Sequence, residues 1–183
     1  MLGALRALAL AASILLASTA HAEEEPPVFA GHPAITRHTK ELGLEVTPMR
    51  LDSGWAIGGG AAVSAFYSRW LSPVAGANLS PGWAGKRAHW DTRAGTRLVY
   101  PSPLFGEVFG YVILGTSVLF TAVDGQDDTF TRAFMLMGGI GLFGNVADHV
   151  RLRFELRDHV RIYGTSDTKH MPTASLAFVL TYR

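Results

Sequence analysis

Apolar and polar residues alternate almost throughout the segment from Val150 to Tyr163. The even positions carry Val, Leu, Phe, Leu, Asp, Val and Ile, whereas the odd positions carry Arg, Glu, His and Tyr. Successive side chains of a β-strand point to opposite faces, so this pattern predicts a long strand with one apolar and one charged face. A helix would spread the same charges around its circumference.

Seven further segments complete a prediction of eight strands. Three of them alternate in the same way, namely Leu42–Thr47, Trp90–Tyr100 and Ala174–Tyr182. The other four are rich in Gly, Ala, β-branched and aromatic residues but alternate weakly, and their context assigns them as strands: Trp55–Ser68, Pro73–Leu79, Gly106–Thr121 and Phe130–Phe143. The fold class that follows is all-β.

The breaks between these segments predict an eight-stranded antiparallel up-and-down transmembrane barrel. With the mature N-terminus in the periplasm, three breaks are periplasmic turns, at Trp70–Ser72, Pro101–Leu104 and Gly144–His149. The other four are surface loops, at Asp52–Gly54, Ser80–His89, Val123–Thr129 and Gly164–Met171. Short turns at one end and polar loops at the other are typical of outer-membrane barrels.

The first residues predict export. Arg6 precedes an uncharged apolar run, Ala7–Ala20, which ends at the small-residue triplet Ala20-His21-Ala22. This order indicates a cleavable signal peptide over residues 1–22, and the run is short for a membrane anchor. Residues 23–40, acidic and proline-bearing, are expected to form a flexible periplasmic segment. The barrel is then expected over residues 41–183.

Composition narrows the class of protein. The chain is 48% hydrophobic and 17% charged, and it has 20 glycines and no cysteine. Without disulfides, an exported domain depends on a core or on closure within a membrane. No uncharged stretch after the leader reaches the roughly 20 residues of a helical span. The net charge of +1 gives no indication of a nucleic-acid partner.

Alternation alone does not decide which face of the barrel is outside. A soluble periplasmic ligand-binding barrel, with its charges in water, satisfies the same pattern. The signal peptide, the glycine-rich central strands and aromatic residues at the strand ends favour a membrane barrel. These aromatics are Trp55 and Trp90 at one rim and Tyr100 and Tyr182 at the other.

In a membrane barrel the charged face lines the lumen, and we expect an ion network there. Its predicted members are Glu45, Asp91, Arg93, Arg97, Arg151, Arg153, Glu155 and Arg157. One interpretation is a structural network that fills the interior, and the other is the lining of a narrow anion-selective channel. The interior of an eight-stranded barrel is just wide enough for side chains, which favours the structural interpretation.

Other candidate chemistry is weak. Gly58-Gly59-Gly60 lacks the lysine and helix of a phosphate loop. His149 and His159 share one face of a strand but lie roughly 33 Å apart, too far for one metal ion. No His-x-Ser spacing occurs that would place a base beside a nucleophile. We therefore expect no catalytic, cofactor-binding or metal-binding residues.

Three motifs resemble the myxobacterial-type outer-membrane β-barrel domain family, related to small OmpA/OmpX-like barrels. They are Pro101–Glu107 between two strands, Leu152–Asp158 (LRFELRD) and Leu176–Tyr182 (LAFVLTY). The chain departs from this family in ending at Arg183, after the aromatic Tyr182, and in having Glu107 where a lysine is expected. The resemblance implies a non-catalytic outer-membrane barrel of structural or surface-interaction type. Its implied partners are outer-membrane lipid and the barrel-assembly machinery, and no surface ligand is indicated.

Overall fold

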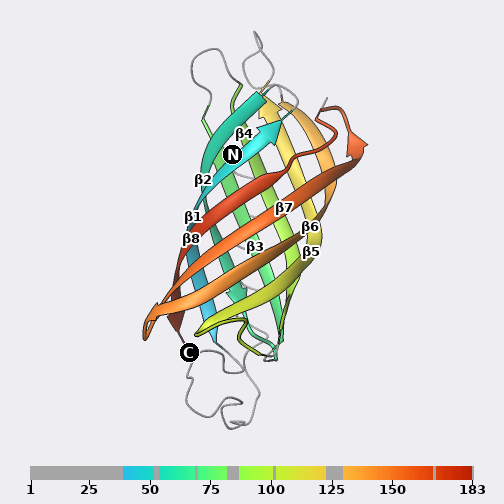
Figure 1. Ribbon diagram of the computed structural model, residues 1–183. Helices are drawn as coiled ribbons and strands as arrows, with labels where there is room; N and C mark the ends of the chain where they lie inside the picture. The colour runs from blue at the N-terminus through green and yellow to red at the C-terminus, as the bar shows by residue number, and fades with distance from the viewer. Residues whose placement is uncertain are drawn as a thin grey trace.

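Eight strands make up the structure, a computed structural model (Figure 1) that describes residues 39–51, 54–68, 70–81, 87–100, 102–122, 130–166 and 168–182. The strands are β1 (Lys40–Leu51), β2 (Gly54–Ala65), β3 (Leu71–Ser80), β4 (His89–Val99), β5 (Val108–Ala122), β6 (Phe130–Ala147), β7 (Val150–Gly164) and β8 (Thr173–Tyr182). No helix long and apolar enough to cross a membrane occurs in these ranges.

The strands form a closed barrel in chain order, and every neighbouring pair is antiparallel. Closure joins β1 to β8, with Leu42 opposite Leu180. Figure 1 shows the strands steeply tilted around the barrel axis. We call the end where Thr39 and Tyr182 lie the terminal end, and the end where β1 connects to β2 the loop end. The predicted all-β, eight-stranded antiparallel barrel is confirmed.

Side chains alternate between the interior and the outer surface, as the sequence pattern predicts. Along β7 the odd residues from Arg151 to His159 are buried, and the even residues from Leu152 to Val160 are exposed. The same parity holds along β1, where Glu41 and Glu45 are buried and Leu44 is exposed. The charged face of these strands therefore lies inside the barrel.

The weakly alternating strands owe their irregular pattern to glycines that make room for long interior side chains. A Cβ on Gly60 of β2 would stand 2.0 Å from the side-chain oxygen of Asn78. A Cβ on Gly76 of β3 would stand 3.0 Å from the guanidinium carbon of Arg93. Small residues thus stand at interior positions where a side chain from the neighbouring strand fills the lumen.

The first strand is longer than predicted and includes a proline. It begins at Lys40, a residue expected to belong to the leader, and continues to Leu51 rather than ending at Thr47. The pairing of β1 with β2 runs through Pro48, but the pairing with β8 skips from Val46 to Met49. Because proline has no N–H, it interrupts the ladder on one side only.

Two predicted turns also differ from the structure. The predicted turn Gly144–His149 is wrong in length, because β6 continues to Ala147 and only Asp148 and His149 connect it to β7. A bulge between Asn145 and Ala147 shifts the register before the last pair, Ala147 with Val150. Gly106 does not begin the fifth strand as predicted. It has a φ of 53° in a turn closed by a bridge between Phe105 and Val108.

Parts of the sequence-based predictions lie outside the described residues. They are the signal peptide at residues 1–22, nearly all of the segment 23–40, and the central parts of the loops at residues 82–86 and 123–129. Asp52, Ser53, Pro101 and Arg183 also lie outside them.

Candidate functional site

The interior contains all eight side chains predicted for the ion network. Each is at most 4% exposed. They come from three strands that are not neighbours: Glu45 from β1, Asp91, Arg93 and Arg97 from β4, and Arg151, Arg153, Glu155 and Arg157 from β7. Some of their ion pairs cross the lumen, such as Arg93 with Glu45, and others join residues of one strand, such as Arg153 with Glu155.

Glu41, at the terminal end of β1, is an additional member of this network. Its carboxylate accepts hydrogen bonds from Arg97 at 3.0 Å, Arg151 at 2.7 Å and the Ser64 hydroxyl at 2.7 Å. Arg153 lies 3.6 Å from the same carboxylate. The sequence analysis missed Glu41 because it began the strand one residue later. The sequence did contain an indication of its role, because Glu41, Gly43 and Glu45 are at alternate positions and therefore share one face of the strand.

Glu155 is a second centre of the network. It lies 3.5 Å from Arg97, 3.1 Å from Arg153 and 3.4 Å from Arg157. The Tyr111 hydroxyl donates a hydrogen bond of 2.7 Å to the same carboxylate. Glu41 and Glu155, with the four arginines that contact them, form what we call the lower cluster, on the side of the terminal end.

A smaller group, the upper cluster, lies toward the loop end. Arg93 donates a short hydrogen bond to Glu45, and its guanidinium lies 3.9 Å from Asp91. Asp91 also accepts a hydrogen bond of 3.2 Å from the amide of Asn78. Both carboxylates also interact electrostatically with Arg157, which lies between the two clusters.

Two buried histidines bond to hydroxyl side chains rather than to carboxylates. His159 lies 2.7 Å from Ser117, and His89 lies 3.0 Å from Thr121. The sequence could not indicate these pairs, because 42 and 32 residues separate their members. His149, in contrast, lies in the exposed turn after β6. Within the described ranges, no three His, Asp or Glu side chains come together as a metal site.

Apolar side chains occupy the rest of the interior. At the loop end a cluster includes Met49, Leu51, Leu119, Met135 and Met171, of which Met171 comes from the segment before β8 and is fully buried. A second cluster lines β2 to β6 and includes Phe66, Phe109 and Phe143. The Arg151 guanidinium lies over two of its rings, 5.9 Å from Phe66 and 5.2 Å from Phe143.

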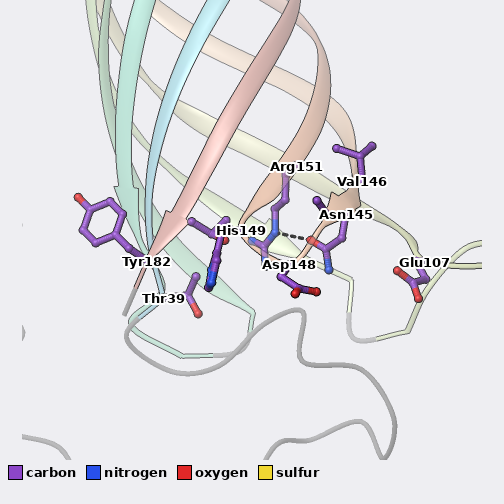
Figure 2. A pocket seen from close by; sticks show the side chains of 10 residues that line it. Thr39, Glu107, Asn145, Val146, Asp148, His149, Arg151 and Tyr182 are labelled. Carbon is purple, nitrogen blue, oxygen red and sulfur yellow. Dashed lines mark hydrogen bonds between the residues drawn. The ribbon is translucent and has the colours of Figure 1, made fainter.

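A hollow of about 910 Å³ opens at the terminal end of the barrel. It is lined by the turn between β6 and β7, by Thr39 just before β1, and by Tyr182, the last residue of β8. Figure 2 shows Arg151 at its inner side, donating a hydrogen bond of 2.8 Å to Asn145. His149 and Asp148 lie at its rim together with Tyr182. We call this hollow the terminal mouth. It leads from the solvent to the first arginine of the lower cluster.

Comparison with known proteins identifies the fold. Neisserial surface protein A is 15% identical, with a TM-score of 0.59 over 80% of this chain and 96% of that one. The N-terminal β-barrel domain of Pseudomonas aeruginosa OprF is 14% identical, with a TM-score of 0.54 over 76% and 97%. Ail, the attachment invasion locus protein of Yersinia pestis, is 13% identical, with a TM-score of 0.52 over 80% and 100%.

The chain therefore has the fold of the small outer-membrane β-barrels. No protein-family model and no curated sequence matches it. The resemblance to the myxobacterial-type family is accordingly not confirmed.

Proposed function

We propose that this protein is an integral outer-membrane β-barrel of structural or surface-interaction type, without catalysis. One observation carries the proposal, namely an interior that is charged and an exterior that is apolar. Leu44, Leu114 and Ile140 on the outer surface are 60–66% exposed, whereas the lumenal arginines are at most 4% exposed. A soluble barrel has the opposite distribution, because exposed apolar surface on this scale is unfavourable in water.

The apolar exterior continues around the barrel. Large aliphatic and aromatic side chains are exposed on β1, β2, β5, β6, β7 and β8, among them Leu42, Val46, Ile57, Val112, Leu136, Leu152, Phe154, Leu156, Leu176, Phe178 and Leu180. Strands of 10 to 18 residues are long enough to cross a bilayer when tilted. This surface fits contact with lipid acyl chains, which makes outer-membrane lipid the first partner we propose.

Aromatic side chains at the two ends of the strands support the same assignment. Trp55 is exposed at the loop end, and Tyr67, Tyr100 and Tyr182 are exposed at the terminal end. Trp90 packs against Phe120 with ring centroids 4.7 Å apart. Aromatic girdles of this kind lie at the two membrane interfaces of outer-membrane barrels.

The filled lumen favours a structural role over the narrow anion-selective channel. Salt bridges join β1, β4 and β7 across the interior, and the apolar cluster around Met171 occupies its loop end. Ions crossing this interior would have to displace buried, paired side chains. A binding or structural barrel therefore fits the packing better than a conducting one.

The proposal also excludes catalysis by the Ser117–His159 pair. A serine hydroxyl bonded to an imidazole is the beginning of a nucleophile and base arrangement. Here Ser117 is 2% and His159 is 1% exposed, inside the closed barrel, so a substrate has no route to the hydroxyl. We interpret the pair as part of the polar packing of the lumen.

Cell fractionation tests the location. The protein is expected to sediment with outer membranes, to need detergent for extraction, and to shift in mobility on a gel when heated, because closed barrels resist unfolding in cold detergent. Recovery in the fraction released by osmotic shock, soluble without detergent, would instead support the soluble periplasmic barrel.

A further inference from the structure

The buried charges inside the barrel do not cancel. Among the described residues the buried ionised groups are five arginines and the four carboxylates of Glu41, Glu45, Asp91 and Glu155. One positive charge is therefore in excess when every carboxyl group is ionised. A buried charge without a counter-charge is strongly unfavourable, so an interior of this kind favours a compensating anion.

The excess lies in the lower cluster. Glu41 and Glu155 together face four guanidinium groups within 4 Å: those of Arg97, Arg151, Arg153 and Arg157. In the upper cluster, Glu45 and Asp91 share Arg93. Arg157 also interacts electrostatically with Glu45 and Asp91, so two arginines balance the two carboxylates of the upper cluster. The excess positive charge therefore belongs to the terminal half of the lumen, where Arg97, Arg151 and Arg153 surround Glu41 and Glu155. An anion is thus attracted to the terminal half.

Buried N–H groups of the lower cluster lack acceptors. Arg153 uses Nη1 and Nε toward Glu41 and Glu155, but its buried Nη2 has neither a hydrogen bond nor an ion pair to any described residue. Arg157 likewise has Nε and Nη1 without hydrogen bonds. Buried donors without partners are rare in folded proteins and call for an acceptor.

Gly43 lies beside this free donor. It faces the lumen on β1, and a Cβ there would stand 3.1 Å from Arg153 Nη2, 3.3 Å from a methyl group of Val179 and 3.7 Å from the carbonyl oxygen of Ala62. The guanidinium group therefore packs closely against the backbone of β1. Such close surroundings suit a small anion better than a large oxyanion.

The terminal mouth adjoins the lower cluster through Arg151. This arginine lines the mouth (Figure 2) and also donates to Glu41, the carboxylate that Arg153 approaches. We propose that the lower cluster binds one small monovalent anion, such as chloride, at the guanidinium of Arg153. Binding completes the charge balance of the interior and does not require conduction, so it goes beyond the proposed structural function.

Thermal unfolding of the purified protein in detergent micelles tests the site. Sodium chloride should raise the unfolding temperature with saturation, and sodium gluconate at equal ionic strength should not. At a free chloride concentration ten times the dissociation constant, the folding equilibrium constant should rise about elevenfold. Equal effects of chloride and gluconate would overturn the proposal, and so would a larger effect of sulfate than of chloride.

Two variants locate the site, each with a matched control. Arg153→Gln should abolish the response to chloride, whereas Arg50→Gln, on the exposed outer side of β1, should keep it. Gly43→Ala keeps every charge and adds a methyl group directly against Nη2, so it should weaken the response. Its control is Gly138→Ala, where the nearest atom to the new Cβ is a Leu114 methyl at 3.8 Å.

Chloride NMR on the unmodified protein gives a second measurement if Arg153→Gln does not fold. Exchange with a protein site should broaden the chloride signal, and excess bromide should reverse the broadening. Gly43→Ala should broaden it less than Gly138→Ala. Absence of broadening by the unmodified protein, or equal broadening by the two glycine variants, would contradict binding at Arg153.

Discussion

The phenol ring of Tyr111 lies against the backbone of Gly141, so closely that a Cβ on Gly141 would stand 2.2 Å from the ring. The two residues face each other on the paired strands β5 and β6. This position lets the Tyr111 hydroxyl reach Glu155 on β7 at 2.7 Å. The absence of a side chain at Gly141 therefore helps to position a donor of the lower cluster.

Gly141→Ala should destabilise the barrel by displacing this ring. Overpacking of a well-packed interior costs about 1–3 kcal/mol, and the bond from Tyr111 to Glu155 would lengthen or break as well. Urea titration in micelles measures the change. Gly138→Ala on the outer surface should leave the midpoint almost unchanged, and an equal loss in both variants would show that the contact with Tyr111 is not the cause.

Glu41→Gln should be among the most damaging conservative substitutions. It removes the carboxylate that Arg97, Arg151 and Arg153 share, and loss of one partner from a buried ion pair costs about 3–5 kcal/mol. The free energy of unfolding in urea checks this value.

An exposed carboxylate provides the control for Glu41. Asp158 pairs with His170 at 3.5 Å, with both side chains more than half exposed. Asp158→Asn should change the free energy of unfolding by less than about 1 kcal/mol. A Glu41→Gln variant as stable as Asp158→Asn would show that the lower cluster does not depend on this carboxylate.

Neighbouring residues of β7 should differ in their tolerance of charge. Leu156→Arg puts a cation on the exposed apolar face and should cost about 2–4 kcal/mol near the membrane midplane. Arg157→Gln should cost less, because Glu155 keeps Arg97, Arg153 and Tyr111. Equal losses in micelle unfolding would mean that the faces of this strand are assigned incorrectly.

Planar bilayers containing the protein should show no steady conductance at neutral pH. Buried, paired side chains fill the lumen, and Met171 is enclosed at its loop end. Stable anion-selective current steps, lost when Arg153 and Arg157 are both made neutral, would instead establish the channel.

Strict alternation made the charged strands predictable from sequence. In β7 from Arg151 to Val160, and in β4 from Trp90 to Leu98, parity alone separates the interior from the surface. It fails at Tyr163, predicted on the charged face, because a bulge opposite Phe134 and Met135 shifts the register and leaves this side chain 73% exposed. The glycine-rich β2 and β3 lack this signal. Their small residues, such as Gly60 and Gly76, are explained by Asn78 and Arg93 on the neighbouring strands, which a local pattern does not reveal.

Which charged residues pair across the lumen could not be predicted from the sequence, for a similar reason. Parity indicated that Arg151 and Arg153 share a face with Glu155, but it gave no information about which strand stands opposite. The contact of Arg151 with Glu41 joins residues 110 apart, and that of Arg97 with Glu41 joins residues 56 apart. Such pairs depend on how the strands are staggered around the closed barrel, and the sequence of a single strand does not reveal this stagger.

The distribution of these ion pairs also constrains the order of folding. Arg93, Arg153 and Arg157 each have a carboxylate on their own strand. Arg97 on β4 and Arg151 on β7, however, meet Glu41 of β1 only across the lumen, so a partly formed open sheet leaves these two arginines without Glu41. Those guanidinium groups must stay hydrated until β1 pairs with β8. Water therefore leaves the interior only when the last pair of strands joins, and insertion of the hairpins one by one into a dry bilayer is unfavourable for this chain.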